Sequence, residues 1–407
     1  MLNVSSSVSC SFISVISELF YLRSCWIDRL EIYFVFEFMM IIRWTFFVLL
    51  IVLMTQEDAA DKECKELLLV QVLFRHGDRA PLRLYPTDPN PVSIWPGGLG
   101  ALTKLGKLQL YVLGQQLRYM YREFLTTNPI EINVNSSEYD RCLESTESFL
   151  ASFYAPTDEF KFSRNVDWQP LPVHSVPKEI DKDLDTGSFC PTTDAEEKRI
   201  INSPDGQAYI AKHKEMFDYL TFYSGTPITD WITAYYLFDT LFVENKYNLT
   251  IPVWAHKYWD ELQEVYDESY YWWYKSYLMK RLRGGPLMKK LIEIMNEKID
   301  GKLPDLKFQI FSTHDDNLAL LLEIFDIFPL KLPPYASTLL FELYRGTDNA
   351  NFVRLLYLNS TEPELGNQTP HILKLHGCEE YCPLEFFTKS AQPFFPVNWE
   401  EECGITR

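Results

Sequence analysis

Short, nearly unbroken apolar runs alternate with longer amphipathic stretches along the chain after position 60. Residues 67–74 form the first run, LLLVQVLF, in which a single glutamine interrupts the apolar residues. A run of this kind is typical of a central strand in a parallel sheet that helices cover on both faces. Further strands are expected at residues 131–134, 307–313, 338–344 and 352–358.

Between these runs, apolar residues recur at the spacing of helices. Thr103 is expected to cap a helix whose wide apolar stripe reaches position 124 and packs on the sheet. Residues 195–299 contain little that resembles a strand and are rich in tyrosine and tryptophan, which we interpret as helix packing rather than a ligand cage. Helices are expected at residues 144–154, 215–223, 230–247, 254–282, 287–299 and 317–327.

This order of elements predicts an α/β protein with an open, mostly parallel sheet covered by helices and with an inserted all-helical domain. The chain has 407 residues, of which 47% are hydrophobic, so it can form cores of this size. The expected divisions are a leader at 1–60, an α/β domain in two parts at 61–160 and 301–407, and the helical insert at 161–300.

The leader has two parts. Residues 1–38 form no recognisable module, and we interpret them as a gene-model extension before a true start at Met39 or Met40. Arg43, an apolar block at 44–54 and a polar exit then follow the pattern of a secretory signal peptide. The block is short for a membrane span, which needs about 20 residues, so membrane attachment is expected only if the signal is an uncleaved anchor.

The net charge of −18 bears on the choice of partner. Nucleic acid attracts basic surfaces, so an acidic chain with a sequence pI of about 4.9 is not expected to bind it. A phosphate ester is not excluded, because a local arginine cluster can hold an anion within an acidic protein.

Such a cluster directly follows the first apolar run and contains Arg75, His76, Gly77 and Arg79. Ligands in open α/β sheets bind beyond the carboxyl ends of strands, so these side chains are expected to face the ligand crevice. Two guanidiniums can hold a phosphate by forked hydrogen bonds while His76 presents a ring nitrogen to phosphorus. A loop whose arginines meet solvent is the alternative, and the spacing alone does not decide between the two.

A second strand end carries His314 and Asp315 at the start of a predicted helix. A lone His-Asp pair has little specificity. Together with Arg75-His76-Gly77-x-Arg79-x-Pro81, however, it resembles the histidine acid phosphatase family, which includes secreted and lysosomal acid phosphatases and phytases. The resemblance covers nearly the whole chain after the leader. Further matches are Trp95-Pro-x-Gly, Leu102-Thr103-x-x-Gly106, Gln169-Pro-Leu-Pro-Val-His174, Gly284-Gly285 and Cys378-x-x-x-Cys382-Pro-Leu.

The resemblance implies an acid phosphatase that hydrolyses small-molecule or protein phosphate monoesters without a cofactor or metal. His76 would attack phosphorus and form a phosphohistidine while Arg75 and Arg79 hold the phosphate oxygens. His314 would add a hydrogen bond or a charge. Asp315 would protonate the departing alkoxide and then help water hydrolyse the intermediate, which favours turnover at low pH. A homodimer remains open.

One position departs from the family pattern. The family carries Arg-Ser-Thr-Asp-x-Asp-Arg with a further phosphate-binding arginine at its start, whereas this chain has Asn135 there. Loss of a forked cation could cost a few kcal/mol of transition-state stabilisation, and Asn135 can donate only one neutral hydrogen bond. The alternative function is therefore a phosphate-binding pseudophosphatase with weakened or lost turnover.

Six cysteines follow the leader. An even number in a secreted chain indicates disulfides, although His371, His376, Cys378 and Cys382 could also be drawn as a zinc site. The resemblance favours a Cys378–Cys382 disulfide and suggests Cys190–Cys403. Cys64 and Cys142 are then left, and they are expected to pair.

N-glycosylation sequons also fit a secreted chain. Glycosylation is expected at Asn248, Asn359 and Asn367, and the sequon at Asn135 is expected to stay unoccupied inside the crevice. The sequence therefore predicts a secreted or lysosomal glycoprotein.

Overall fold

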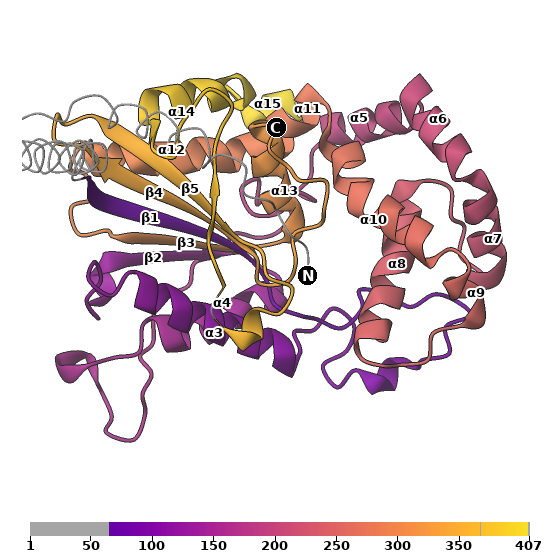
Figure 1. Ribbon diagram of the computed structural model, residues 1–407, viewed down its shortest axis with the longest axis horizontal. Helices are drawn as coiled ribbons and strands as arrows, with labels where there is room; N and C mark the ends of the chain where they lie inside the picture. Colours follow the sequence, from indigo (N-terminus) through magenta and orange to yellow (C-terminus); the bar gives the residue numbers. More distant parts are fainter. Residues whose placement is uncertain (1–64, 367, 406–407) are drawn as a thin grey trace, which may run out of the picture. The chain divides into compact units, whose positions relative to one another are not determined.

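The computed structural model describes residues 65–366 and 368–405 (Figure 1). The leader, Cys64 and Asn367 lie outside the described residues, so the signal peptide, the start at Met39 or Met40 and glycosylation of Asn367 stay predictions. Within the described part of the chain, no helix combines the length and hydrophobicity that a membrane crossing requires.

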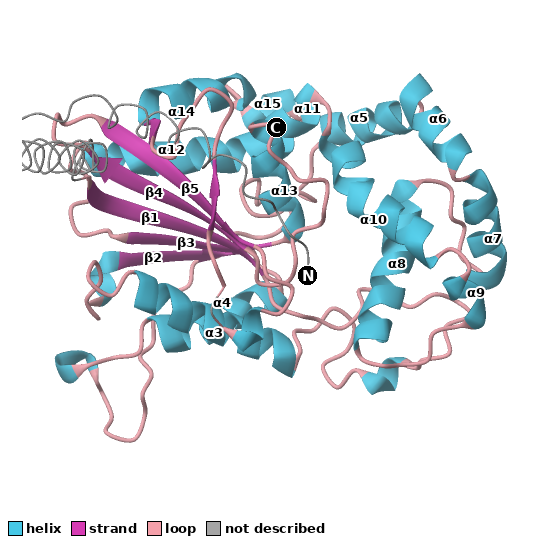
Figure 2. Ribbon diagram, viewed as in Figure 1, coloured by secondary structure: helices cyan, strands magenta, loops and turns pink. Residues whose placement is uncertain are grey.

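A seven-stranded sheet forms the centre of the described structure (Figure 2). The strands are Glu66–Arg75 (β1), Ile132–Ser136 (β2), Phe308–Thr313 (β3), Thr338–Arg345 (β4), Asn351–Leu358 (β5), His371–Leu373 (β6) and Cys382–Pro383 (β7). Their order is β2-β3-β1-β4-β5-β6, with β7 paired to β5. β3 is parallel to β1 and β2, while β4 is antiparallel to both β1 and β5, so β5 points the same way as β1. The predicted α/β class with a mostly parallel sheet is confirmed.

Helices cover both faces of this sheet (Figure 1). Lys104–Met120 (α3) and Asp140–Phe153 (α4) lie on one face, and Gly285–Ile299 (α12) and Leu384–Ala391 (α14) lie on the other. Successive side chains of a strand point to opposite faces. Leu69 and Leu73 therefore pack with α12 and α14, whereas Val70, Val72 and Phe74 pack with α3 and α4. This double burial explains why β1 is almost continuously apolar.

The sequence signals at the starts of α3 and α4 differ. Thr103 caps α3 as predicted, because its hydroxyl oxygen accepts a hydrogen bond of 3.0 Å from the Gly106 N–H. α4 begins at Asp140, four residues before the expected start at 144, and the preceding Tyr139 makes no side-chain cap. The earlier start places Arg141 in the first turn of α4.

A helical region lies beyond the carboxyl ends of the parallel strands (Figure 1). It contains Pro191–Ile201 (α5), Pro204–Lys212 (α6), Lys214–Ser224 (α7), Trp231–Lys246 (α8), Val253–His256 (α9), Trp259–Tyr274 (α10) and Tyr277–Met279 (α11), followed by a π-helical turn at Lys280–Gly284. Buried Trp231, Phe238 and Tyr270 belong to its core. Many of the aromatic residues therefore serve helix packing, as the sequence suggested.

The helix Asp315–Ile324 (α13) contacts both regions. Leu318 and Leu321 pack with the sheet, while Ala319 and Leu320 pack with the helical region. Buried residues on two faces of α13 thus fix this helix, whose first residue is Asp315, against both the sheet and the helical region.

The predicted insert at 161–300 includes α12, which packs on the sheet, and its boundaries stay a prediction. Leu287 and Leu291 of α12 belong to the core of the sheet, and Gln71 Nε2 on β1 donates a hydrogen bond of 2.8 Å to the Leu291 carbonyl oxygen. The apolar stripe of α12 is therefore part of the sheet layer. Short 3-10 turns lie at Val92–Ile94, Pro129–Glu131, Asp158–Phe160, Pro363–Leu365 and Gln392–Phe394.

Two of the three expected disulfides are confirmed. Cys190 is bonded to Cys403, which follows the helix Trp399–Glu402 (α15), and Cys378 is bonded to Cys382. The bond between Cys378 and Cys382 rules out the zinc arrangement at these two sulfurs.

The expected pair of Cys64 with Cys142 is wrong, because Cys142 is a free, buried thiol. Its Sγ lies 3.6 Å from the Thr313 carbonyl oxygen, and Thr313 pairs with Arg75 at the carboxyl end of β1. The ten residues of β1 span about 30 Å, and in the sequence only Lys65 stands between Cys64 and the strand. Cys142 therefore lies at the wrong end of β1 for this pair.

Candidate active site

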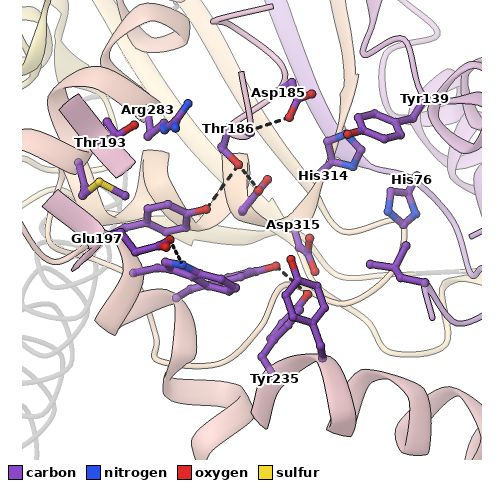
Figure 3. Close-up of a pocket in the computed structure, with 18 of the residues that line it drawn as sticks. His76, Tyr139, Asp185, Thr186, Thr193, Glu197, Tyr235, Arg283, His314 and Asp315 are labelled. Atoms are coloured by element: carbon purple, nitrogen blue, oxygen red, sulfur yellow. Dashed lines mark hydrogen bonds between the residues drawn. The ribbon is translucent and has the colours of Figure 1, made fainter. Parts of the chain in front are cut away.

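A cavity of about 490 Å³ opens at the carboxyl ends of β1 and β3, between the sheet and the helical region. Figure 3 shows His76, His314 and Tyr139 on one side of it, Glu197 and Arg283 on the other, and Asp315 between them. The two strand ends that the sequence singled out thus meet at one cavity. We call its part around Arg75, His76, Arg79, Arg141, His314 and Asp315 the phosphate half.

The turn after β1 depends on glycine packing. A Cβ atom at Gly77 would lie 2.4 Å from the carbonyl oxygen of Gly106 at the start of α3, so no larger residue fits there. The next residue, Asp78, is fully buried, and its carboxylate accepts a hydrogen bond of 2.7 Å from Thr103 Oγ1 and an ion pair of 2.7 Å from Lys246 Nζ. These contacts hold the turn rigidly in front of the cavity.

His76 is held as a neutral imidazole. Its Nδ1 lies 2.8 Å from the Gly77 carbonyl oxygen, which can only accept, so Nδ1 carries the proton and Nε2 carries the lone pair. Burial, and then the charges of Arg141 and Arg75, hold the pKa of His76 well below its ordinary value. The surroundings therefore favour the unprotonated ring, the form that has a free lone pair.

Two arginines beside His76 are paired with buried carboxylates. The Arg75 guanidinium lies 2.8 Å from Asp315 Oδ2, and Arg79 forms a forked pair with Asp239 on α8 at 3.0 and 2.9 Å. Burial lowers the pKa of each arginine, but its carboxylate partner and the nearby tyrosines together more than offset this, and both pKa values lie above the ordinary one. The ring of Tyr335 lies 4.2 Å from the guanidinium of Arg75. Both guanidiniums are thus charged and fixed in position.

A third guanidinium, which we did not select from the sequence, comes from Arg141. Its Nη2 lies 3.3 Å from His314 Nδ1, and its guanidinium lies 4.4 Å from the ring of Tyr139. In the described part of the chain, no carboxylate lies within ion-pairing distance of Arg141. Burial lowers its pKa from the ordinary value. This buried cation lines the cavity and would be stabilised by an anion bound there.

Asn135 does not lie in the phosphate half, which corrects the sequence-based expectation. Its Oδ1 accepts a hydrogen bond of 2.8 Å from Gln309 Nε2, and its side chain lines a different cavity beside α12. The alternation of side chains along β2 turns this position toward α12. Arg141, six residues later, supplies the guanidinium that seemed to be missing. The pseudophosphatase alternative therefore loses the observation on which it was based.

His314 and Asp315 enter the cavity from the loop between β3 and α13. Arginine can only donate, so His314 Nδ1 accepts from Arg141 and its Nε2–H donates to Ser137 Oγ at 3.1 Å. Burial and the three arginines hold the pKa of His314 well below its ordinary value, so it contributes hydrogen bonding rather than charge. Asp315 is the first residue of α13, where the helix N-terminus favours a carboxylate.

The family follows from comparison with known proteins. The model of the histidine phosphatase superfamily, branch 2, matches residues 66–358, which include both halves of the motif pair. The chain belongs to this family. Lysosomal acid phosphatase of Xenopus laevis is 33% identical over 351 residues, covering 84% of this chain and 80% of that protein. Human prostatic acid phosphatase is 35% identical over 354 residues, covering 84% and 89%.

Solved structures agree on the fold. The phytase from Citrobacter braakii matches with a TM-score of 0.63 and covers 84% of this chain and 100% of that one, at 18% identity. Hafnia alvei phytase in complex with tartrate has a TM-score of 0.63 at 16% identity. At these identities the likeness concerns the fold alone.

Proposed function

We propose that this protein hydrolyses phosphate monoesters through a phosphohistidine formed on His76. The observation that carries the proposal is the neutral His76 imidazole, whose lone pair on Nε2 lies among three guanidiniums with Asp315 lining the same cavity. The family and the acid phosphatases among its relatives support the same reaction.

In the first step, Arg75, Arg79 and Arg141 bind the phosphate oxygens. The His76 Nε2 lone pair forms a bond to phosphorus, and the bond from phosphorus to the ester oxygen breaks. Asp315 gives its proton to the departing oxygen, which leaves as an alcohol. The fixed guanidiniums stabilise the charge on the equatorial oxygens in the transition state.

In the second step, a water molecule attacks the phosphorus of phosphohistidine. Asp315 takes a proton from this water, the bond between phosphorus and His76 breaks, and inorganic phosphate leaves. His314 orients Arg141 through its 3.3 Å contact and does not itself change charge, because it is held neutral.

The ion pair between Arg75 and Asp315 adds a timing element. A phosphate that enters the cavity competes with Asp315 for the same guanidinium, whose Nη2 lies 2.8 Å from Asp315 Oδ2. Once Arg75 binds the phosphate, its ion pair with Asp315 breaks, and the Asp315 carboxyl group can turn toward the leaving oxygen.

We further propose a destination in the secretory pathway, as a secreted or lysosomal protein. Several relatives are lysosomal acid phosphatases, and two disulfides suit an oxidising compartment. Asn248 and Asn359 are exposed, as glycan acceptors must be.

The test is hydrolysis of 4-nitrophenyl phosphate at pH 5. His76→Ala is expected to lower kcat by roughly 1,000-fold or more, because it removes the nucleophile. Alanine at the exposed His371 is the matched control and should leave kcat unchanged. Rapid quenching with a radiolabelled ester should trap acid-labile phosphate on wild-type protein and none on His76→Ala. Full turnover by His76→Ala would contradict the mechanism.

The role of Asp315 has a separate test. Asp315→Asn should lose much more activity toward an alkyl phosphate than toward 4-nitrophenyl phosphate, since an alkoxide leaves poorly without a proton and nitrophenolate leaves well. Equal losses for both esters would show that Asp315 is not the acid.

A further inference from the structure

The remainder of the cavity lining, outside the phosphate half, has a different character. We call it the leaving-group half (Figure 3). It combines four carboxyl groups with aromatic faces and two guanidiniums: Asp185, Asp194, Glu197 and Asp316, then Tyr236, Trp273 and Tyr274, and finally Arg83 and Arg283. An ester bound through its phosphate at His76 must place its leaving group against this wall.

The two guanidiniums of the leaving-group half have different surroundings. Arg283 donates to the Ser188 carbonyl oxygen, and its Nη2 lies 3.5 Å from Asp194. The guanidinium of Arg83 lies over the ring of Tyr236, 3.6 Å from its centre. In the described structure, therefore, Arg283 has a carboxylate partner, whereas Arg83 contacts an aromatic face and has no carboxylate within ion-pairing distance.

Three of the carboxyl groups have only neutral donors. Asp185 accepts a hydrogen bond of 2.8 Å from the Gly187 N–H, Glu197 accepts one of 2.7 Å from Trp273 Nε1, and Asp316 accepts from the Thr186 hydroxyl. Among the described residues, none of the three lies within ion-pairing distance of a cation. With four carboxyl groups against two guanidiniums, the leaving-group half carries a formal charge of −2 when ionised.

The surrounding charges are limited. Three nearby basic residues belong to the phosphate half: His314, Arg141 and Arg75. Lys178 lies 5.4 Å from the ring of Tyr139 and does not line the cavity. Burial raises the pKa of Asp185 and Glu197, and burial together with Asp315 raises the pKa of Asp316 to about 7. The negative charge of this wall therefore grows as the pH rises from 5 toward 8.

Aromatic faces and carboxylates recognise the same kind of ligand. A flat ring stacks on tyrosine and tryptophan, and a positive charge is attracted both by their faces and by carboxylates. A second phosphate or a carboxylate in this place would meet uncompensated negative charge.

We propose that the preferred substrates are aryl phosphate monoesters that carry a positive charge on the part of the leaving group farthest from phosphorus, and that polyphosphorylated substrates are disfavoured. This inference rests on the proposed phosphatase function and names the substrate class of the same site.

Three esters with the same phenolic leaving oxygen test it. Tyramine phosphate carries an ammonium group at the far end, 4-ethylphenyl phosphate carries none, and the phosphate of 3-(4-hydroxyphenyl)propionate carries a carboxylate. At pH 7 we expect kcat/KM to fall in that order, with about 10-fold between the first and the last. The ratio should be smaller at pH 5, where Asp316, whose pKa is raised to about 7, is largely protonated. Inositol hexakisphosphate should be hydrolysed more slowly than any of the three.

Variants locate the effect. Glu197→Gln and Asp316→Asn should each move the ratio of the cationic to the anionic ester toward one, whereas Glu293→Gln, on the exposed side of α12, should leave the ratio unchanged. A ratio near one in the wild type, a reversed order, or hydrolysis of inositol hexakisphosphate at the rate of tyramine phosphate would overturn the inference while phosphatase activity persists. If none of the esters is hydrolysed, the proposed function fails first.

Discussion

The two halves of the cavity are built in different ways. The phosphate half comes from residues at strand ends and first helical turns, and buried carboxylates fix two of its arginines. The leaving-group half includes side chains of α5, α8, α10 and the π-helical turn, and most of its carboxyl groups accept only neutral hydrogen bonds. The comparison teaches that chemistry and selectivity depend on separate contacts, which separate substitutions can break.

The largest effect is expected from breaking the pair of Arg79 with Asp239, whose side chains are 2% and 1% exposed. Asp239→Ala leaves a buried cation unpaired and should lower the free energy of unfolding by about 3–5 kcal/mol, measured by urea denaturation. Asp218→Ala, which breaks an exposed pair with Lys214, is the control and should cost at most about 1 kcal/mol.

A double variant separates stability from chemistry in the phosphate half. Arg79→Met combined with Asp239→Leu removes both buried charges, so most of the lost stability should return. Phosphatase activity should not return, because a phosphate-binding cation is gone. Recovery of activity would contradict the role given to Arg79.

The next largest effect concerns Arg141. Arg141→Ala should lower kcat toward 4-nitrophenyl phosphate by about 100- to 1,000-fold, since it removes a fixed cation from the transferring phosphoryl group. Arg141→Lys keeps the positive charge but cannot form forked hydrogen bonds, so its kcat should lie between those of Arg141→Ala and the wild type. Arg122→Ala, at an exposed position, is the matched control. The ratio between cationic and anionic esters should stay the same in Arg141→Lys, because Arg141 belongs to the other half.

A smaller, pH-dependent effect is expected where α8 meets the loop that follows the phosphate half. Glu244 on α8 is fully buried, and burial together with nearby Asp88 raises its pKa from 4.5 to about 8. The folded protein therefore holds a proton that the unfolded chain releases, so this contribution to stability falls as the pH rises from about 4.5 to about 8. In Glu244→Gln the fall in Tm between pH 5 and pH 8 should be smaller, by on the order of 2 °C. An unchanged fall would contradict this protonation; Glu293→Gln is the exposed control.

The smallest effect is expected at Asn135. Asn135→Arg should change kcat/KM by no more than about twofold, because this side chain lies beside Gln309 and lines a cavity near α12. A large gain in turnover would restore the earlier idea that this position contacts phosphate.

Much of the phosphate half could be predicted from sequence because its signals are local. The apolar run of β1 ends directly at Arg75 and His76, and strand periodicity before His314 predicts the second end. Both strands run parallel, so their carboxyl ends meet at one edge of the sheet.

The rest required tertiary structure. α4 starts without a side-chain cap, so no capping residue in the sequence marks Arg141 as part of a first helical turn. Asp239 is buried within α8, and only the fold brings it to Arg79, 160 residues earlier. The face to which Asn135 points depends on the register of β2 with β3, which a motif comparison does not contain.

The disulfide between Cys190 and Cys403 has a consequence for selectivity. Cys190 precedes α5, the helix that carries Asp194 and Glu197, and Cys403 follows α15 near the end of the chain. The segment after α15 is thus covalently tied to the start of a helix of the leaving-group half, while no disulfide among the described residues joins the elements that carry the arginines and histidines of the phosphate half. In a reducing environment, substrate selectivity should therefore weaken before the residues of the phosphate half are displaced.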